Sequence, residues 1–245
     1  WPGMQIAGKD NLRQQSAMWQ AMLMSAGLLP SMQILIHGFV TSEGQKMSKT
    51  VGNVVDPVEI VKKYGIDPVR YYLLREISST EDGDFSYKKL EDRYNGDLAN
   101  NLGNLISRVA KLIETKLNGE LNFDEKFIDH EARRKIEETA EKYKKAVKEF
   151  RLHEALATVW DLLGYANSFI DIHKPWAKDE DADHLLKTLT TTLNIILNAA
   201  WFIKPFLPET SAKIFAAFSA GNDYKSWIGH KFVVNKVEPL FPRLQ

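Results

Sequence analysis

The stretch LANNLGNLISRVAKL, from Leu98 to Leu112, carries the clearest folding signal in this chain. Large aliphatic side chains recur in it at intervals of four, three, four and three residues, at Leu98, Leu102, Leu105, Val109 and Leu112. This spacing places them in one stripe along an α-helix. We therefore predict an amphipathic helix whose apolar side packs against other helices.

The chain after this helix repeats the pattern. A second stripe with the same rhythm runs from Leu152 to Ile170, and the span from Leu185 to Phe202 is apolar on more than one face. Residues 130–150 are rich in both signs of charge, which indicates a helix with much solvent contact. Pro208 begins a further helix. Short connections between such helices predict an antiparallel bundle, with residues 231–245 extended and packed back on it.

The first fifty residues alternate between strand and helix. Short strands are predicted at Gln5–Ala7 and Ile34–Val40, with a helix from Leu12 to Ala26 between them. Met18 and Met22 in that helix are interpreted as core side chains. The order indicates an α/β region, and such sheets bind ligands at the carboxyl ends of their strands. The predicted fold is therefore mainly α, with a partial α/β region ahead of an α-helical bundle.

Two short helices are predicted to connect these regions. Asp56-Pro57 and Asp67-Pro68 each place an acidic cap before a proline at the first helical position, and Gly65 ends the first helix. Ser78 to Asp84 is polar and acidic, and we predict a loop there with Gly83 in its turn. From residue 87 onward no strand is predicted until the last few residues.

Composition limits the classes of protein to which the chain can belong. It has 245 residues, 44% of them hydrophobic and 26% charged, with a formal net charge of zero. A uniformly basic nucleic-acid binder is excluded, so an anionic partner must meet a local patch. The absence of cysteine fits a cytoplasmic protein, and no apolar run is long enough for a membrane helix. Because Trp1 opens the chain inside an apolar segment, we expect a longer parent protein.

The segment GQKMSKTVGN, from Gly44 to Asn53, places two lysines three residues apart between glycines. Glycine on both sides predicts a loop whose backbone adopts positive φ angles and can move. Such lysines can serve solubility alone, or they can form a clamp for phosphate groups.

The polar side of the first bundle helix is the second candidate site. Asn101, Asn104 and Arg108 follow helical spacing, with Asp97 one turn earlier. Asn104 and Arg108 are four residues apart, so their side chains project together. Amide and guanidinium groups can read the edge of an unpaired base, although the same pattern also fits a solvated helix surface.

The motif HKPWAK, at residues 173–178, is the third candidate. Its proline ends a helix and fixes the turn that carries Trp176 between two lysines. An indole in such a turn can be a lid on the core or a platform on which a base stacks. The six histidines are scattered, so no metal site is predicted.

The lysine loop resembles the second signature of class I aminoacyl-tRNA synthetases, K-M-S-K-S. A series of further motifs along the whole chain resembles the methionyl-tRNA synthetase family: AGKDN at 7–11, HGF at 37–39, GNVVDP at 52–57, DPVRYYLLREI at 67–77, DGDFS at 82–86, NLGNLISR at 101–108, HKPWAK at 173–178, PFLPETSAKI at 205–214 and EPLFPRL at 238–244.

This resemblance implies three parts. Residues 1–52 correspond to the second half of a Rossmann-type catalytic domain, 53–90 to a stem-contact segment, and 91–245 to an α-helical anticodon-binding domain. The implied activity is methionine–tRNA ligation, in which ATP activates methionine for transfer to tRNA. The implied partners are tRNA with a CAU anticodon, methionine and ATP with Mg²⁺, in the cytoplasm and without a membrane.

The resemblance also implies roles for individual residues. Lys46 and Lys49 would be catalytic and neutralise charge that develops on the phosphates, with Lys49 as the direct triphosphate contact. The implied anticodon-binding residues are Asn104, Arg108 and Trp176. The implied ATP-binding residues are Gly8, Asp10, His37, Gly38, Lys46, Met47, Ser48 and Lys49.

The chain also departs from the family pattern. The first signature, H-I-G-H or a variant, is absent, and Gln14 and Gln15 stand where a histidine is usual. Two alternatives stay open: another class I synthetase, for example for cysteine or isoleucine, and a catalytically inactive tRNA-binding module.

Overall fold

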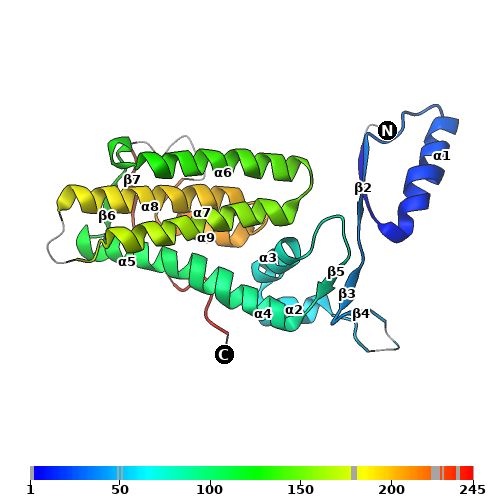
Figure 1. Cartoon of the computed structure of the whole chain (residues 1–245), viewed down its shortest axis with the longest axis horizontal. Helices are drawn as coiled ribbons and strands as arrows, with labels where there is room; N and C mark the ends of the chain where they lie inside the picture. The colour runs from blue at the N-terminus through cyan, green and yellow to red at the C-terminus, as the bar shows by residue number, and fades with distance from the viewer. Residues whose placement is uncertain are drawn as a thin grey trace.

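The computed structural model describes residues 3–48, 50, 52–177, 181–221, 227, 229–235 and 238–244. Figure 1 shows an elongated molecule, with a small strand–helix–strand unit at one end and a long helical bundle at the other. Short helices and strands lie between them. No described helix is long and apolar enough to span a membrane.

The small unit consists of β1 (Met4–Gly8), α1 (Trp19–Ser25) and β2 (Gln33–His37), with a 3₁₀ turn and a π-wound turn leading into α1. The two strands are parallel and in register from Met4↔Gln33 to Gly8↔His37. The predicted order of strand and helix is confirmed. The interpretation of Met18 and Met22 as core side chains is wrong, because their exposed fractions are 55% and 62%. Nothing in the described chain packs over that face of the helix.

The middle region joins both ends of the molecule. β3 (Val40–Ser42) pairs with β4 (Gln45–Lys46) on one side and with β5 (Gly83–Phe85) on the other. The helices α2 (Pro57–Tyr64), α3 (Ile66–Glu76) and α4 (Tyr87–Arg93) enclose a small apolar cluster. Its buried members are Ile60, Tyr64, Val69, Tyr72, Phe85 and Leu90.

The strand β5 corrects the prediction of a loop with Gly83 in its turn. Three residues with the sequence Gly-Asp-Phe carry no alternating pattern, so only pairing with the distant β3 makes them a strand. The carboxylate of Asp84 accepts hydrogen bonds from Thr41 Oγ1 at 2.6 Å and from the Gly44 N–H at 2.7 Å. These hydrogen bonds lower the pKa of Asp84.

The two Asp-Pro pairs differ. Asp56 caps α2 as predicted, because its side chain accepts a hydrogen bond from the Val58 N–H at 2.8 Å. Asp67 does not cap α3: the helix begins at Ile66, and Asp67 Oδ2 instead accepts from the Thr210 N–H and hydroxyl, each at 2.7 Å. A tertiary partner 143 residues away therefore replaced the expected local one.

The bundle begins with a π-helix, η3 (Tyr94–Gly103), which continues directly into α5 (Asn104–Lys116). It is completed by α6 (His130–Lys148), α7 (Leu152–His173), α8 (Ala182–Ile203) and α9 (Pro208–Ala217). The predicted stripe is confirmed: Leu98, Leu102, Leu105 and Val109 are fully buried, and Leu112 packs at the edge of the same core. On α8 most of the middle turns are buried, as predicted for a central helix.

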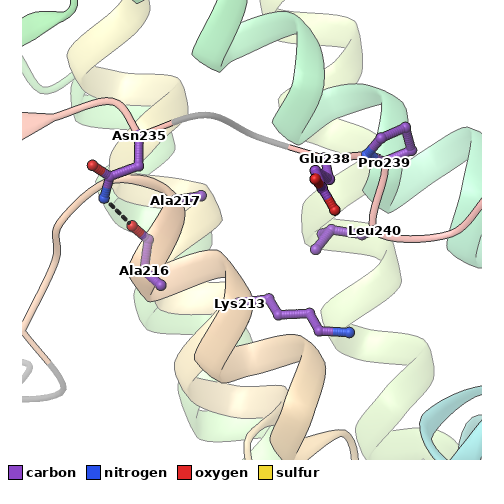
Figure 2. Close-up of a pocket in the computed structure, with 7 residues that line it drawn as sticks. All are labelled: Lys213, Ala216, Ala217, Asn235, Glu238, Pro239 and Leu240. Carbon is purple, nitrogen blue, oxygen red and sulfur yellow. Dashed lines mark hydrogen bonds between the residues drawn. The ribbon is translucent and has the colours of Figure 1, made fainter.

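The chain after α9 returns to the bundle, as predicted. β7 (Lys231–Val233) pairs with β6 (Glu120–Asn122), a strand that the sequence did not reveal because it is short and depends on this distant partner. Asn235 Nδ2 donates to the Ala216 carbonyl at 2.7 Å beside a cavity of about 380 Å³, which lies between α9 and the returning chain (Figure 2). Its lining residues are Lys213, Ala216, Ala217, Asn235, Glu238, Pro239 and Leu240, none of which belongs to a predicted site.

Candidate functional site

The parallel strands bring together three of the residues proposed to bind ATP. Gly8 and His37 are paired at the carboxyl ends of β1 and β2, and Asp10 follows in the next turn. A Cβ atom on Gly8 would lie 2.7 Å from Asp10 Oδ1 and 3.4 Å from His37 Cε1. Glycine leaves this space open without a shift of the Asp10 side chain, so the backbone at the end of the strand pair is flanked by a carboxylate and an imidazole.

Gly38, the fourth of these residues, has a structural reason to be glycine. A Cβ atom there would lie 2.2 Å from the Glu81 carbonyl oxygen, so the segment before β5 can pass closely only over glycine. Asp82 in that segment pairs with Lys9 and accepts a hydrogen bond from the Phe39 N–H at 2.7 Å. The Lys9 ammonium and the Phe39 N–H together hold the pKa of Asp82 below its ordinary value.

The lysine loop is a closed turn between two glycines at positive φ, 77° at Gly44 and 74° at Gly52, as predicted. Asn53 closes the turn: its Oδ1 accepts from the Ser48 N–H at 2.8 Å, and its Nδ2 donates to the Lys46 carbonyl at 3.2 Å. This role of Asn53 was missed, although an asparagine directly after the second loop glycine is a fitting signal.

The side chains of this loop lie in different environments. Met47 packs against the apolar cluster under α2 to α4 and anchors the loop. The side chain of Lys46 is exposed, and Ser48 is half-buried. Lys49, the residue expected to contact the triphosphate, lies outside the described residues.

Phe39 links the strand ends to the lysine loop, a contact that sequence reasoning missed. The Lys9 ammonium lies 4.4 Å from the centre of its ring, and the Lys46 ammonium lies 5.9 Å from it. Both cations are within the range of a cation–π contact. The structure therefore places Lys46 near Phe39, two residues after the end of β2.

On the bundle, the structure brings Arg108 and Trp176 together across two helices. The guanidinium carbon of Arg108 on α5 lies 5.4 Å from the centre of the Trp176 ring, and its Nη2 donates to Asp171 Oδ1 on α7 at 2.5 Å. Asn104 is exposed one helical turn before Arg108. Trp176 is 45% exposed, which does not fit a buried lid on the core.

The turn that carries Trp176 is held from three directions. Lys174 ends α7 in the left-handed conformation at φ 45°, and the Ala177 N–H bonds back to its carbonyl at 3.0 Å. Lys116 Nζ donates to the Ala177 carbonyl at 3.3 Å, and His184 Nε2 on α8 lies 3.1 Å from the His173 carbonyl. The indole therefore projects from a fixed turn beside α5.

The other two residues of the predicted polar face have internal partners. Asn101 accepts a hydrogen bond from Asn167 on α7 at 2.8 Å, and Asp97 accepts one from the Tyr71 hydroxyl at 2.7 Å. Burial and the Asp97 carboxylate raise the pKa of Tyr71. Of the four residues Asn104 is exposed, whereas Asp97, Asn101 and Arg108 are half-buried. Asp171, the partner of Arg108, was missed by sequence reasoning.

The chain is similar to known proteins along its whole length. The family model "tRNA synthetases class I (M)" matches residues 2–110, and "Anticodon-binding domain of tRNA ligase" matches residues 129–236. The methionine–tRNA ligase of Caldanaerobacter subterraneus is 37% identical over the whole chain, and that of Bacillus subtilis is 35% identical. The crystal structure of Mycobacterium tuberculosis methionyl-tRNA synthetase bound by methionyl-adenylate superposes with a TM-score of 0.91 at 32% identity, covering 99% of this chain and 50% of that one.

The chain belongs to the methionyl-tRNA synthetase family. It spans 40% of the Caldanaerobacter relative and 39% of the Bacillus relative. This methionyl-tRNA synthetase segment thus holds a region that matches the class I synthetase model and a helical bundle that matches the anticodon-binding domain model. Within its described residues, no three His, Asp or Glu side chains lie close enough together to hold a metal ion.

Proposed function

We propose that this chain is the lysine-loop and anticodon-binding part of a methionine–tRNA ligase, which activates methionine with ATP and transfers it to tRNA. The observation that carries the proposal is the exposed contact between Arg108 and Trp176 on a bundle attached to the strand ends and the lysine loop. The division into residues 1–52, 53–90 and 91–245 is part of the same proposal, as is a cytoplasmic location, where translation takes place.

The bundle face has the chemistry to read an unpaired anticodon. The exposed indole of Trp176 offers a flat surface for base stacking, and Arg108 and Asn104 offer hydrogen bonds for base edges beside it. Arg108 keeps one side of its guanidinium fork on Asp171 and can use its other N–H groups for RNA. We propose that these three residues bind the CAU anticodon.

The other end of the chain has the chemistry to hold ATP. We propose that Gly8, Asp10, His37 and Gly38 bind the nucleoside side, and that the loop from Lys46 to Lys49 binds the phosphates. Met47 and Ser48 would fix that loop, because Met47 is anchored in the apolar cluster and the Ser48 N–H is bonded to Asn53. The lysines would stabilise negative charge in the transition state, and Mg²⁺ would share that charge with them.

RNA binding by the 245-residue chain tests the anticodon assignment. We expect a stem-loop with CAU in its loop to bind more tightly than the same stem-loop with another anticodon. Trp176→Ala and Arg108→Ala should each weaken CAU binding by about 1–3 kcal/mol, in fluorescence anisotropy titrations. The two losses should be less than additive if both side chains hold the same base.

The control for this test is thermal unfolding of the same variants. Because Trp176 is largely exposed, its truncation should cost far less than the roughly 3–5 kcal/mol expected for a buried tryptophan. A Trp176→Ala protein that is as stable as the wild type and still prefers CAU would contradict the anticodon assignment.

The second candidate is a tRNA-binding module without catalysis. Such a module would need only the bundle, which carries the contact between Arg108 and Trp176. We expect the 245-residue chain to show no methionine-dependent ATP–pyrophosphate exchange, because catalysis of this kind depends on positioning by a whole site. We expect exchange by a longer protein that contains the whole catalytic site. In that protein Lys49→Ala should slow the exchange by the equivalent of about 2–4 kcal/mol of transition-state stabilisation. This result would support the ligase and exclude the module.

A further inference from the structure

The helix that leads to the anticodon face is wound unusually. Residues 94–103 form a π-helix, and the Asn104 N–H still bonds to the carbonyl five residues back, at Ala99. A π turn contains more residues than an α turn, so its winding sets the direction in which Asn104 and Arg108 project. Something must favour this winding over a plain α-helix.

Two donors on α7 bond to carbonyls of this π-helix. Trp160 Nε1 donates to the Asp97 carbonyl at 3.2 Å, and Asn167 Nδ2 donates to the Asn101 carbonyl at 3.2 Å. Main-chain carbonyls of a regular helix normally bond within the helix, so side-chain donors from a neighbour stabilise the altered winding. Trp160 bonds to the first half of the π-helix, and Asn167 bonds close to its end, three residues before α5 begins.

The orientation of the Asn167 amide follows from its partners. Its nitrogen faces three oxygen atoms: the Asn101 carbonyl at 3.2 Å, Asn101 Oδ1 at 2.8 Å and the Leu163 carbonyl at 3.1 Å. Two of these are main-chain carbonyls, which accept only, so a donor must occupy this position. The half-buried Asn167 therefore acts as a bridge between α7 and the end of η3.

This bridge lies one turn before the residues of the anticodon face on both helices. Asn101 precedes Asn104 by three residues, and Asn167 precedes Asp171 by four. Asp171 in turn holds Arg108, which contacts Trp176. The distance and rotation between α7 and α5 at this level decide whether the three proposed RNA-binding residues share one surface.

We infer that Asn167 is a positioning residue for anticodon recognition, which it serves by fixing the π-wound end of η3 against α7. The inference rests on the proposed anticodon site. Asn167 touches no RNA in this scheme. It acts through Asn101, which keeps Asn104 and Arg108 in phase with Trp176.

The test compares three variants of the 245-residue chain in their binding to a CAU stem-loop and to the same stem-loop with another anticodon. Asn167→Ala removes the donor, and Asn167→Asp replaces it with an acceptor that faces two carbonyls. Asn198→Ala is the matched control, because Asn198 is a buried asparagine on α8 whose amide nitrogen donates to Asn194 within its own helix.

The readout is the ratio of the two dissociation constants, which a loss of stability alone does not change. We expect Asn167→Ala to lower the preference for CAU by roughly tenfold, and Asn167→Asp by at least as much, because each removes the donor to the Asn101 carbonyl. Asn198→Ala should keep the wild-type ratio. Should Asn167→Asp fail to fold, Asn167→Ala and Asn167→Ser at a lower temperature carry the same comparison.

The outcomes separate this inference from the proposed function. If the wild type prefers CAU and Asn167→Ala keeps the full preference, the positioning role is wrong while the anticodon site stands. If Asn198→Ala lowers the ratio as much as Asn167→Ala does, the effect is general softening of the bundle and the inference is again wrong. If the wild type shows no preference for CAU, the proposed anticodon site itself fails, and the inference fails with it.

Discussion

The strand–helix–strand unit at residues 3–38 and the helical bundle differ in where their apolar side chains lie. In the unit, Leu23 is the one large apolar side chain that is buried among the described residues, while Met22, Met24 and Met32 are more than half exposed. In the bundle, most residues of the apolar stripes have exposed fractions near zero. Both regions carry helical apolar patterns, but only the bundle contains, in the same chain, the surfaces that cover them.

The difference shows that an apolar pattern predicts burial only where a partner is present. The unit is held to the rest of the molecule by polar contacts, above all the ion pair of Lys9 with Asp82 and the hydrogen bond from Phe39 to the same carboxylate. The bundle is held by close packing around α8. We therefore expect stability to reside in the bundle.

Truncating one apolar side chain in each region gives the largest expected difference. Leu193→Ala on α8 removes a fully buried side chain and should lower the free energy of unfolding by about 2–5 kcal/mol. Met22→Ala removes a side chain that is 62% exposed and should change it by about 0.5 kcal/mol or less. Urea unfolding followed by circular dichroism measures both. Equal costs for the two variants would mean that the unit has a core that this structure does not show.

The two Asp-Pro pairs lie at the junction between the two regions, and we expect their aspartates to contribute differently to stability. Asp67→Ala leaves the buried N–H and hydroxyl of Thr210 without their acceptor and should cost about 2–3 kcal/mol. Asp56→Ala removes an ordinary helix cap and should cost about 1 kcal/mol. Urea unfolding measures both costs, and Thr210→Val is the control that removes the hydroxyl. A smaller cost at Asp67 than at Asp56 would contradict a tertiary role for Asp67.

The smallest effect is expected at the polar contact of the unit. The pKa of Asp82 is lowered in the folded chain, first by Lys9 and then by the Phe39 N–H, so its stabilisation is complete at neutral pH and is lost as the pH falls through that lowered pKa, below about pH 4. The amide proton shift of Phe39 in an NMR titration reports this ionisation. Lys9→Ala should move the midpoint upward toward the ordinary value of aspartate.

Asp82→Asn is the control for this titration, because it should remove the pH-dependent step in the Phe39 shift altogether. A midpoint that stays the same in Lys9→Ala would show that Lys9 does not hold the carboxylate in solution. In that case the unit would be attached mainly by the pairing of β3 with β5.

Much of the fold followed from local pattern. The stripe from Leu98 to Val109, the central α8 and the alternation of strand and helix near the start were all predicted, because burial on one helix face imposes its period on the residues. The glycines at 44 and 52 were rightly expected at positive φ, since that conformation is a property of single residues. The resemblance assigned Arg108 and Trp176 to one site, and the structure brings the two side chains into contact.

Pairings between distant segments did not follow from any such pattern. β5 and β6 are strands only because β3 and β7 offer them backbone partners, and Asp67 bonds to Thr210 because α9 lies over the start of α3. Asn101 and Asn104 look alike in sequence, yet one bonds to Asn167 and the other stays exposed. Helical spacing tells which side chains share a face of one helix. Which of those faces meets another helix, and which stays open to solvent, depends on how the helices pack.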